Sequence, residues 1–396
     1  MNASPRSNLP EARSRMRNLQ KLGAAGRAGP PSEDASAIAL KHVREREQAA
    51  VVEGDYIREG YFRFPAVTER ARWNYTRTVI DRCAPGPHED GNYFALLARE
   101  AASVEMYLTG LGNPIVNDAV QRIIFGTTGH PSSHARSQLV KDVTIILMSA
   151  GMIYFMYQSA KSVVLSWKPV HSQRGSTFSS NLEDTRQILD RDPTAVNHMA
   201  DLLLEWFFKG VARPSSSTQP PAIYIPPLAL LSRCAERFVL GHEYAHALID
   251  LMHLPVDDVL DVLGRPSGPV TEAWTKEFRA DALATIMVME SAGDFDRFSP
   301  NMSLQGAVLA MKAHDLVEGA LRRIGLPRNL TTHPPFQQRL DFITRVFSET
   351  TNLKDFPINS VIAPAQSLEL IWERVSPKIE RKLNSGKQLS PIWHSS

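Results

Sequence analysis

The chain has 396 residues, and 44 Lys and Arg against 42 Asp and Glu give it a formal net charge of +2. Hydrophobic residues make up 43% and charged residues 22%, which is typical of a soluble globular protein and excludes a wholly disordered or fibrous chain. A net charge so close to zero does not suggest a nucleic-acid partner. The two cysteines, Cys83 and Cys234, are too few for a disulfide scaffold or a cysteine-rich zinc finger, and they fit a reducing, cytoplasmic compartment.

The N-terminal segment is rich in basic residues. Residues 1–30 contain six basic side chains and one acid, Glu11, and they lack the apolar run of a secretory signal. We expect residues 1–35 to form a disordered basic tail. The alternative is an organelle transit peptide, because such peptides are Arg-rich and poor in acids.

Residues 36–212 are expected to form a helical N-terminal region. Within it, apolar residues recur at three- and four-residue spacing over Thr194–Val211 and predict a helix, whereas the polar run His171–Asp184 predicts a loop. The segment Val143–Tyr157 carries no charge, but its 15 residues fall short of the roughly 20 that a membrane-spanning helix needs. We interpret it as a helix or strand buried in the core. The alternative is a short or re-entrant membrane contact, which would make the protein membrane-associated.

A linker is predicted over residues 213–222, because the Ser-, Thr- and Pro-rich stretch Pro214–Pro221 cannot build a core. The apolar run Ile223–Ile225 after it suggests an edge strand, to which an extended substrate backbone could pair. The pattern then predicts helices at about Leu228–Met252, Glu272–Ser291 with Thr271 as the N-cap, Leu304–Ile324 and Pro335–Ser348. Residues 223–350 are expected to form one domain, and residues 351–396 an ordered C-terminal appendage.

The first of these helices contains the pattern HExxH. His242 and His246 are four residues apart, so both imidazoles lie on one face of the helix and can bind one zinc ion. Glu243 follows the first histidine and is placed to act on a zinc-bound water. Within Phe238–Ile249 this glutamate is the only acidic or basic residue apart from the histidines, which favours a buried helix, since an unpaired charge would be costly to desolvate.

A catalytic zinc site needs a third protein ligand and one position open for water. The metzincin extension fails, because Ile249 and Met252 stand where it requires Gly and His. His253 lies one residue after the position that the metzincin pattern requires. It is near the end of the predicted helix, where we expect it to be exposed. Glu277, 31 residues after His246 and on the next predicted helix, is the preferred third ligand.

Asp281 follows Glu277 by one helical turn. It is expected to accept a hydrogen bond from the far ring nitrogen of a ligand histidine, which would fix the histidine tautomer. The apolar run that follows, residues 282–289, favours a largely buried helix over a solvated acidic face. Glu272 is the fallback ligand, but it lacks a paired acid one turn later.

A third segment, Thr332–Leu340 (THPPFQQRL), lies further along the chain. Three motifs together resemble the gluzincin metallopeptidases. In chain order they are HEYAH, the ExxxD pair of Glu277 and Asp281, and THPP followed by three residues, Arg and a hydrophobic residue. Within these, the sequence is similar to the family that contains HtpX-like and CAAX-prenyl-type peptidases, and soluble Lit-like peptidases are a looser comparison. The resemblance covers about residues 228–345. Because the many membrane spans of that family are absent, it implies a soluble relative.

His333 precedes a helix that begins with proline. It is expected to face the cleft and stabilise a developing oxyanion, and the alternative is a local capping contact.

The sequence as a whole predicts a mainly α protein, with an α+β arrangement as the alternative. A zincin-like catalytic domain with a small or minimal sheet follows a helical N-terminal region. The expected function is that of a zinc metallopeptidase with one Zn²⁺ per chain, held by His242, His246 and Glu277, with Glu243 as general base. Its partner would be a protein or peptide substrate. The alternatives are another zinc hydrolase, such as an amidase, and a non-catalytic interaction protein with a structural or degenerate zinc site.

Overall fold

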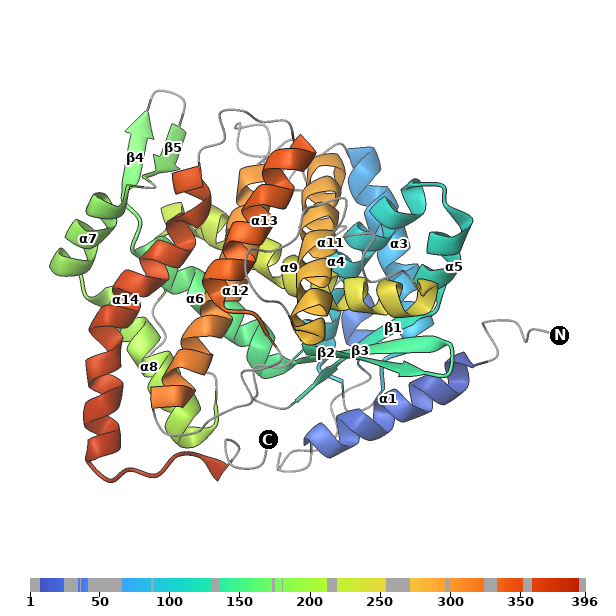
Figure 1. The fold of residues 1–396 in the computed structure, drawn as a ribbon, viewed down its shortest axis with the longest axis horizontal. Coiled ribbons are helices and arrows are strands. Elements are labelled where there is room, and N and C mark those ends of the chain that lie inside the picture. The colour runs from blue at the N-terminus through green and yellow to red at the C-terminus, as the bar shows by residue number, and fades with distance from the viewer. Residues whose placement is uncertain are drawn as a thin grey trace.

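The computed structural model describes residues 8–24, 35, 37–41, 66–86, 89–129, 135–172, 175–179, 181–211, 219–253, 271–295, 300–323, 333–351 and 358–391. The elements up to the linker are α1 (Leu9–Ala24), α3 (Ala66–Cys83), α4 (Gly91–Gly110), α5 (Pro114–Gln121), β1 (Ile123–Thr128), β2 (Ala135–Val140), β3 (Val143–Ser149), α6 (Ala150–Leu165), β4 (Pro169–Ser172), β5 (Gly175–Phe178), α7 (Leu182–Arg191) and α8 (Thr194–Lys209). Those after it are the 3₁₀ turn η3 (Ala222–Tyr224), α9 (Ile225–Met252), α11 (Glu272–Phe295), α12 (Pro300–Arg323), α13 (Phe336–Thr351) and α14 (Ile358–Asn384). The mainly helical prediction is confirmed (Figure 1).

Most of the predicted helices occur where the pattern placed them. Helix α8 ends at Gly210, which adopts a left-handed conformation with a φ of 72° that glycine tolerates without strain. Helix α11 begins after Thr271, whose hydroxyl accepts a hydrogen bond from the backbone N–H of Trp274 at 3.2 Å. This contact confirms Thr271 as the N-cap.

The sheet lies in the N-terminal region, which the sequence described as helical, and the description is wrong for residues 123–149. Its strand order is β1-β3-β2, with β3 parallel to β1 and antiparallel to β2. The charge-free segment Val143–Tyr157 supplies β3 and the start of α6, which meet at Ser149. Its prediction as buried structure is confirmed, and it is a strand followed by a helix. The Ser149 hydroxyl caps α6 by accepting a hydrogen bond from the Met152 N–H at 3.0 Å.

The prediction of a disordered tail is wrong for residues 9–24, which form α1. Ala12, Met16 and Gln20 recur every four residues, and all three are fully buried as a stripe along one face. The stripe packs on β1 and β3 (Figure 1), while basic residues such as Arg15 remain on the exposed side. The basic composition that suggested a tail is therefore the solvated face of an amphipathic helix.

Two further local predictions are wrong. The polar run His171–Asp184 contains the β4–β5 hairpin and the start of α7, and not a single loop. The hairpin is anchored by Phe178, whose ring lies 5.3 Å from that of Tyr224 and 6.3 Å from that of Trp167. The expected edge strand Ile223–Ile225 is a 3₁₀ turn that runs into α9, because the prolines that follow it suit the first turn of a helix.

Helix α9 is the centre of the molecule (Figure 1). Its first half packs into a core built with α6, α8, α11, α12, α13 and α14, through residues such as Leu231 and Phe238. Its second half packs into a core built with α1, α3, α4, α5 and the sheet, through residues such as Leu240 and Leu248. The HExxH pattern therefore lies where the two cores meet.

The C-terminal helix α14 packs against α8 and α12. Its Val361, Leu368 and Ile371 are fully buried in the first core. The indole of Trp167 donates a hydrogen bond at 3.1 Å to the Ser367 hydroxyl and so ties α14 to the end of α6.

Helices α9 and α12 approach closely at Gly306. A Cβ atom added there would lie 2.3 Å from the Cβ of Cys234 on α9, closer than real side chains come. Glycine is therefore required at this crossing. Gly319 on the same helix has no neighbouring atom within 4 Å of an added Cβ.

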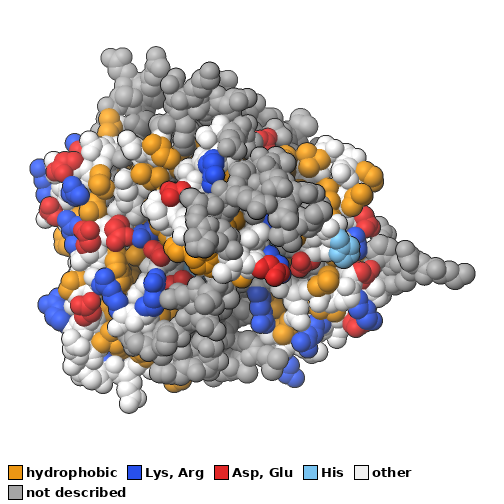
Figure 2. Space-filling model, in the orientation of Figure 1, with side chains coloured by type: hydrophobic (Ala, Val, Ile, Leu, Met, Phe, Trp, Pro, Cys, Tyr) orange, Lys and Arg blue, Asp and Glu red, His pale blue; other side chains and the backbone are white. Residues whose placement is uncertain are grey.

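On the described part of the face in Figure 2, acidic and basic side chains are interspersed, in keeping with the net charge of +2. Among the described helices, none combines the length and apolar character needed to cross a membrane.

We expect Met16→Ala to lower the free energy of unfolding by about 2–4 kcal/mol, because it removes a buried side chain from the contact between α1 and the sheet. Arg15→Ala, a change on the exposed side of α1, is the control and should alter it by less than about 0.5 kcal/mol. Urea unfolding of the two variants measures both effects. Equal stability of the two variants would show that α1 does not contribute to the core.

Gly306→Ala is expected to destabilise the protein by about 1–3 kcal/mol, because the new methyl group forces α9 and α12 apart. Gly319→Ala is the matched control on the same helix. It should stabilise the protein by about 0.5–1 kcal/mol, since alanine restricts the unfolded chain and favours the helix. Thermal unfolding of both variants should therefore give shifts of opposite sign, and shifts of the same sign would contradict the close crossing.

Candidate metal centre

Helix α9 presents two imidazoles on one face, one turn apart. The Nε2 atoms of His242 and His246 are 3.1 Å apart. Both side chains are mostly buried, with exposed fractions of 11% and 22%. Two nitrogen atoms so close, without a polar group between them, are arranged to share one cation or one proton.

Helix α11 brings Glu277 to the same point. Its carboxylate oxygens lie 3.3 Å from Nε2 of His242 and 3.4 Å from Nε2 of His246. In a tetrahedral zinc site with bonds of about 2.0–2.2 Å, ligand atoms are about 3.3–3.6 Å apart. Both distances to Glu277 lie in that range, and the 3.1 Å between the two imidazoles is slightly shorter. Among the described residues these three side chains form the group that could hold a metal ion.

Asp281 supports the site from one turn further along α11. Its Oδ1 lies 3.0 Å from Nδ1 of His242, on the side of the ring that faces away from Glu277. Arg339 on α13 donates to both oxygens of the same carboxylate, at 2.6 and 2.8 Å. Burial alone would raise the pKa of Asp281, but the Arg339 guanidinium outweighs it and lowers that pKa. The aspartate therefore stays ionised and directs Nε2 of His242 toward Glu277.

The charges of the three candidate ligands are mutually dependent. Burial alone would lower the pKa of His242, but hydrogen bonds to Asp281 and Glu277 outweigh it and raise that pKa to about 10. Burial alone would raise the pKa of Glu277, but His242 and His246 hold it well below its usual range. Without a metal the cluster therefore holds a proton between imidazole and carboxylate. A divalent cation would replace that proton and use the same atoms.

Glu243 lies beside the cluster and is not among its three ligands. Only 7% of it is exposed, and the hydroxyl of Ser137 on β2 hydrogen-bonds its carboxylate. Burial raises its pKa, which brings the carboxylate closer to the range of a general base that works near neutral pH.

His333 also reaches the site. Its Nε2 lies 3.4 Å from Oε2 of Glu277, and 40% of its side chain is exposed. The structure thus brings the histidine into contact with Glu277, one of the three candidate ligands, while part of its ring remains exposed.

Two fallback ligands are not in the site. Glu272 is 78% exposed and pairs with Lys276 at 3.2 Å. His253 is the exposed residue that ends α9, with a φ of 50°. Both were less favoured in the sequence than Glu277, and the geometry agrees.

Two residues that contact the site had no predicted role. Arg339 stands in the THPPFQQRL segment, so the sequence pattern contained a signal for it. Ser137 lies on a strand that was not predicted, more than 100 residues before the HExxH motif. The sequence around it contains no pattern that would indicate a role in the site.

The opposite face of α9 is held by two buried carboxylates of α4. The Tyr244 hydroxyl donates a hydrogen bond of 2.5 Å to Glu105, which also pairs with Arg82 of α3. Two turns before Tyr244, Arg237 pairs with Glu100 at 2.6 Å. These contacts fix the rotation of α9 about its axis, and with it the direction in which the two histidines point.

Comparison with protein-family models, curated proteins and solved structures gave no match. What the site can do is therefore inferred from its own geometry.

Asp281→Asn is expected to weaken zinc binding by about 10–100-fold, because the amide cannot hold the His242 ring and the Arg339 charge as the carboxylate does. Asp341→Asn, an exposed change on α13, is the control and should leave zinc affinity unchanged. Competition with a chromophoric chelator measures both affinities. Wild-type zinc affinity in folded Asp281→Asn would remove Asp281 from the site.

Proposed function

We propose that the protein is a zinc-dependent metallopeptidase of the gluzincin type, with a zincin-like catalytic domain. The observation that carries the proposal is the spacing of His242, His246 and Glu277, which suits a tetrahedral zinc ion. In the described residues this group offers three ligands, which leaves a fourth position for water. An open position is typical of catalytic zinc, whereas structural sites are closed by a fourth protein ligand.

Zinc bound here would lower the pKa of a water molecule to about 7 and polarise a carbonyl group. With the metal in place, Glu243 would accept the proton of the attacking water. It would deliver that proton to the leaving amine when the C–N bond breaks. His333 lies at the open side of the ligands and donates a hydrogen bond to the oxyanion that forms during attack.

An exposed edge strand beside the site supports a peptide substrate. Strand β2 pairs with β3 on one side and packs against α9, and Ser137 places it next to Glu243. An extended peptide could add by backbone hydrogen bonds to the side of β2 on which no strand of the described residues pairs. This takes the place of the edge-strand role that the sequence gave to Ile223–Ile225.

An amidase would use the same zinc and the same base. The edge strand favours the peptidase, because backbone pairing needs a substrate with several consecutive peptide units. A protein with a structural zinc site is disfavoured because the described residues supply three ligands and no fourth.

Glu243→Gln should keep about one zinc per chain and lose turnover by at least about a hundredfold, since the amide cannot accept the proton. Glu277→Ala should lose both zinc and activity, because a ligand is removed. Elemental analysis and hydrolysis of a peptide mixture, followed by mass spectrometry, measure the two properties.

His253→Ala is the control on the same helix and should change neither property. Zinc-free wild-type protein after preparation with added zinc would refute the proposed function. Retained turnover in Glu243→Gln would remove the proposed base.

A further inference from the structure

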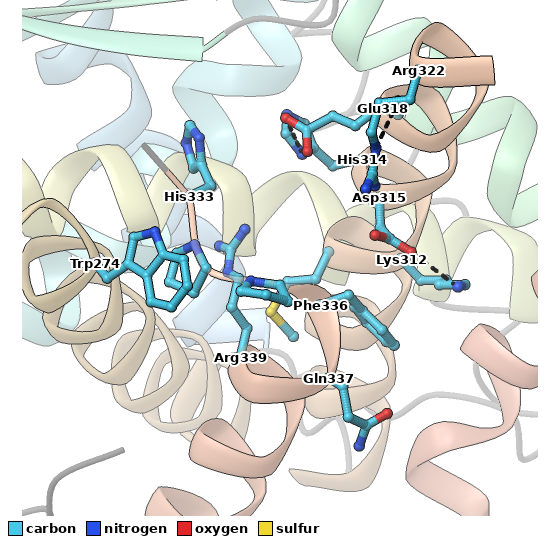
Figure 3. Close-up of a pocket in the computed structure, with 13 residues that line it drawn as sticks. Trp274, Lys312, His314, Asp315, Glu318, Arg322, His333, Phe336, Gln337 and Arg339 are labelled. Atoms are coloured by element: carbon cyan, nitrogen blue, oxygen red, sulfur yellow. Dashed lines mark hydrogen bonds and ion pairs between the residues drawn. The ribbon is translucent and has the colours of Figure 1, made fainter. Parts of the chain in front are cut away.

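A cavity of about 420 Å³ lies between the start of α11, the middle of α12 and the start of α13 (Figure 3). Two of its lining residues connect it to the metal ligands. His333 lines the cavity, and its Nε2 is 3.4 Å from Oε2 of Glu277. Trp274 lies three residues before Glu277, on the same face of α11. The cavity therefore opens directly beside the candidate metal centre.

Apolar groups form much of the cavity wall. The aromatic rings of Trp274 and Phe336 stand on different sides of it (Figure 3). Met311, Pro334 and Pro335 also line the cavity. Aromatic rings and prolines are rigid surfaces that bind another flat or apolar group at low entropic cost. A cavity of this size and composition suits an organic side chain.

Two basic groups of the wall, Lys312 and Arg339, already have partners of opposite charge. Lys312 pairs with Asp315 at 3.0 Å and with Glu369 at 2.5 Å, and it lies 5.1 Å above the Phe336 ring. The Arg339 guanidinium is occupied by Asp281. A charged side chain entering the cavity would lose its hydration and would have to compete with these ion pairs.

The outer part of the cavity is polar. His314 lies 3.8 Å from Glu318, and its ring centre is 5.6 Å from that of His333. Arg322 lies at the same end and is exposed. These groups stay in contact with water and can serve the polar backbone of a bound peptide.

We propose that this cavity holds the substrate side chain next to the scissile bond and selects large uncharged side chains, aromatic ones above all, over charged or very small ones. The selection rests on the proposed peptidase function. Its physical basis is the apolar part of the wall around Trp274 and Phe336, which a large ring can cover, and the pairing of Lys312 and Arg339 with carboxylates, for which a charged side chain would have to compete.

The first test measures binding and does not depend on turnover. Alanine-based host peptides with one central guest residue, Phe, Leu, Asp, Lys or Gly, are titrated into zinc-loaded Glu243→Gln protein, and calorimetry reports binding. We expect the Phe peptide to bind at least about tenfold more tightly than the Asp, Lys and Gly peptides. Equal affinities, tighter binding of a charged peptide or no binding at all would overturn the proposal.

The second test reverses the charge balance of the cavity wall. Lys312→Met keeps the length of the side chain but leaves Asp315 and Glu369 without their cation. The Lys guest peptide should then gain at least about tenfold in affinity relative to the Phe peptide. Lys209→Met on α8, which removes an exposed lysine that pairs with Glu205, is the matched control and should leave the preference unchanged.

If Lys312→Met leaves the ratio of affinities for the Lys and Phe guest peptides unchanged, the cavity does not select the guest side chain. The two proposals can fail separately. Selective binding without cleavage by the wild-type protein would refute the peptidase and leave the cavity as a peptide-binding site, whereas cleavage without selectivity would refute only the cavity.

Discussion

Helix α9 runs between two hydrophobic cores, so most polar side chains on it must find a partner within the protein. A helix buried on several sides stabilises its surroundings through apolar contacts, but each ionisable group that it carries would cost several kcal/mol if left unpaired. The arrangement of the neighbouring helices can be understood from this requirement. Two of them, α4 and α11, bring carboxylates to particular turns of α9.

The partners of the polar side chains of α9 come from α4 on one side and from α11 on the other, and the two sets of contacts have different consequences. On the α4 side, Glu100 pairs with Arg237, and Glu105 accepts a hydrogen bond from the Tyr244 hydroxyl. On the α11 side, Asp281 binds only one nitrogen of His242 and leaves the other directed at Glu277. The contacts with α4 hold α9 in place. The contacts with α11 leave Nε2 of His242 and the Glu277 carboxylate in a position to bind a cation. The proposed catalytic site is thus the incompletely compensated side of a buried helix.

The sequence was informative wherever a local pattern determines the structure. The helix containing His242 and His246, the cap at Thr271 and the spacing of Glu277 from Asp281 all depend on residues within a few turns of each other. The structure places Glu277 as the sequence argument required. The three-stranded sheet was missed because β3 is buried on both faces and reads as one apolar run with the helix after it. Periodicity cannot separate a buried strand from a buried helix in so short a run.

The N-terminal helix α1 depends on partners that are made much later. Its Asn8 donates a hydrogen bond of 2.6 Å to Asp142, 134 residues further along the chain. At translation rates of about 5–20 residues per second, the ribosome needs on the order of ten seconds to make that stretch. Throughout this interval the apolar stripe of Ala12 and Met16 has no sheet to cover. Helix α1 is therefore made well before the sheet on which it packs, and its apolar face stays uncovered until that sheet exists.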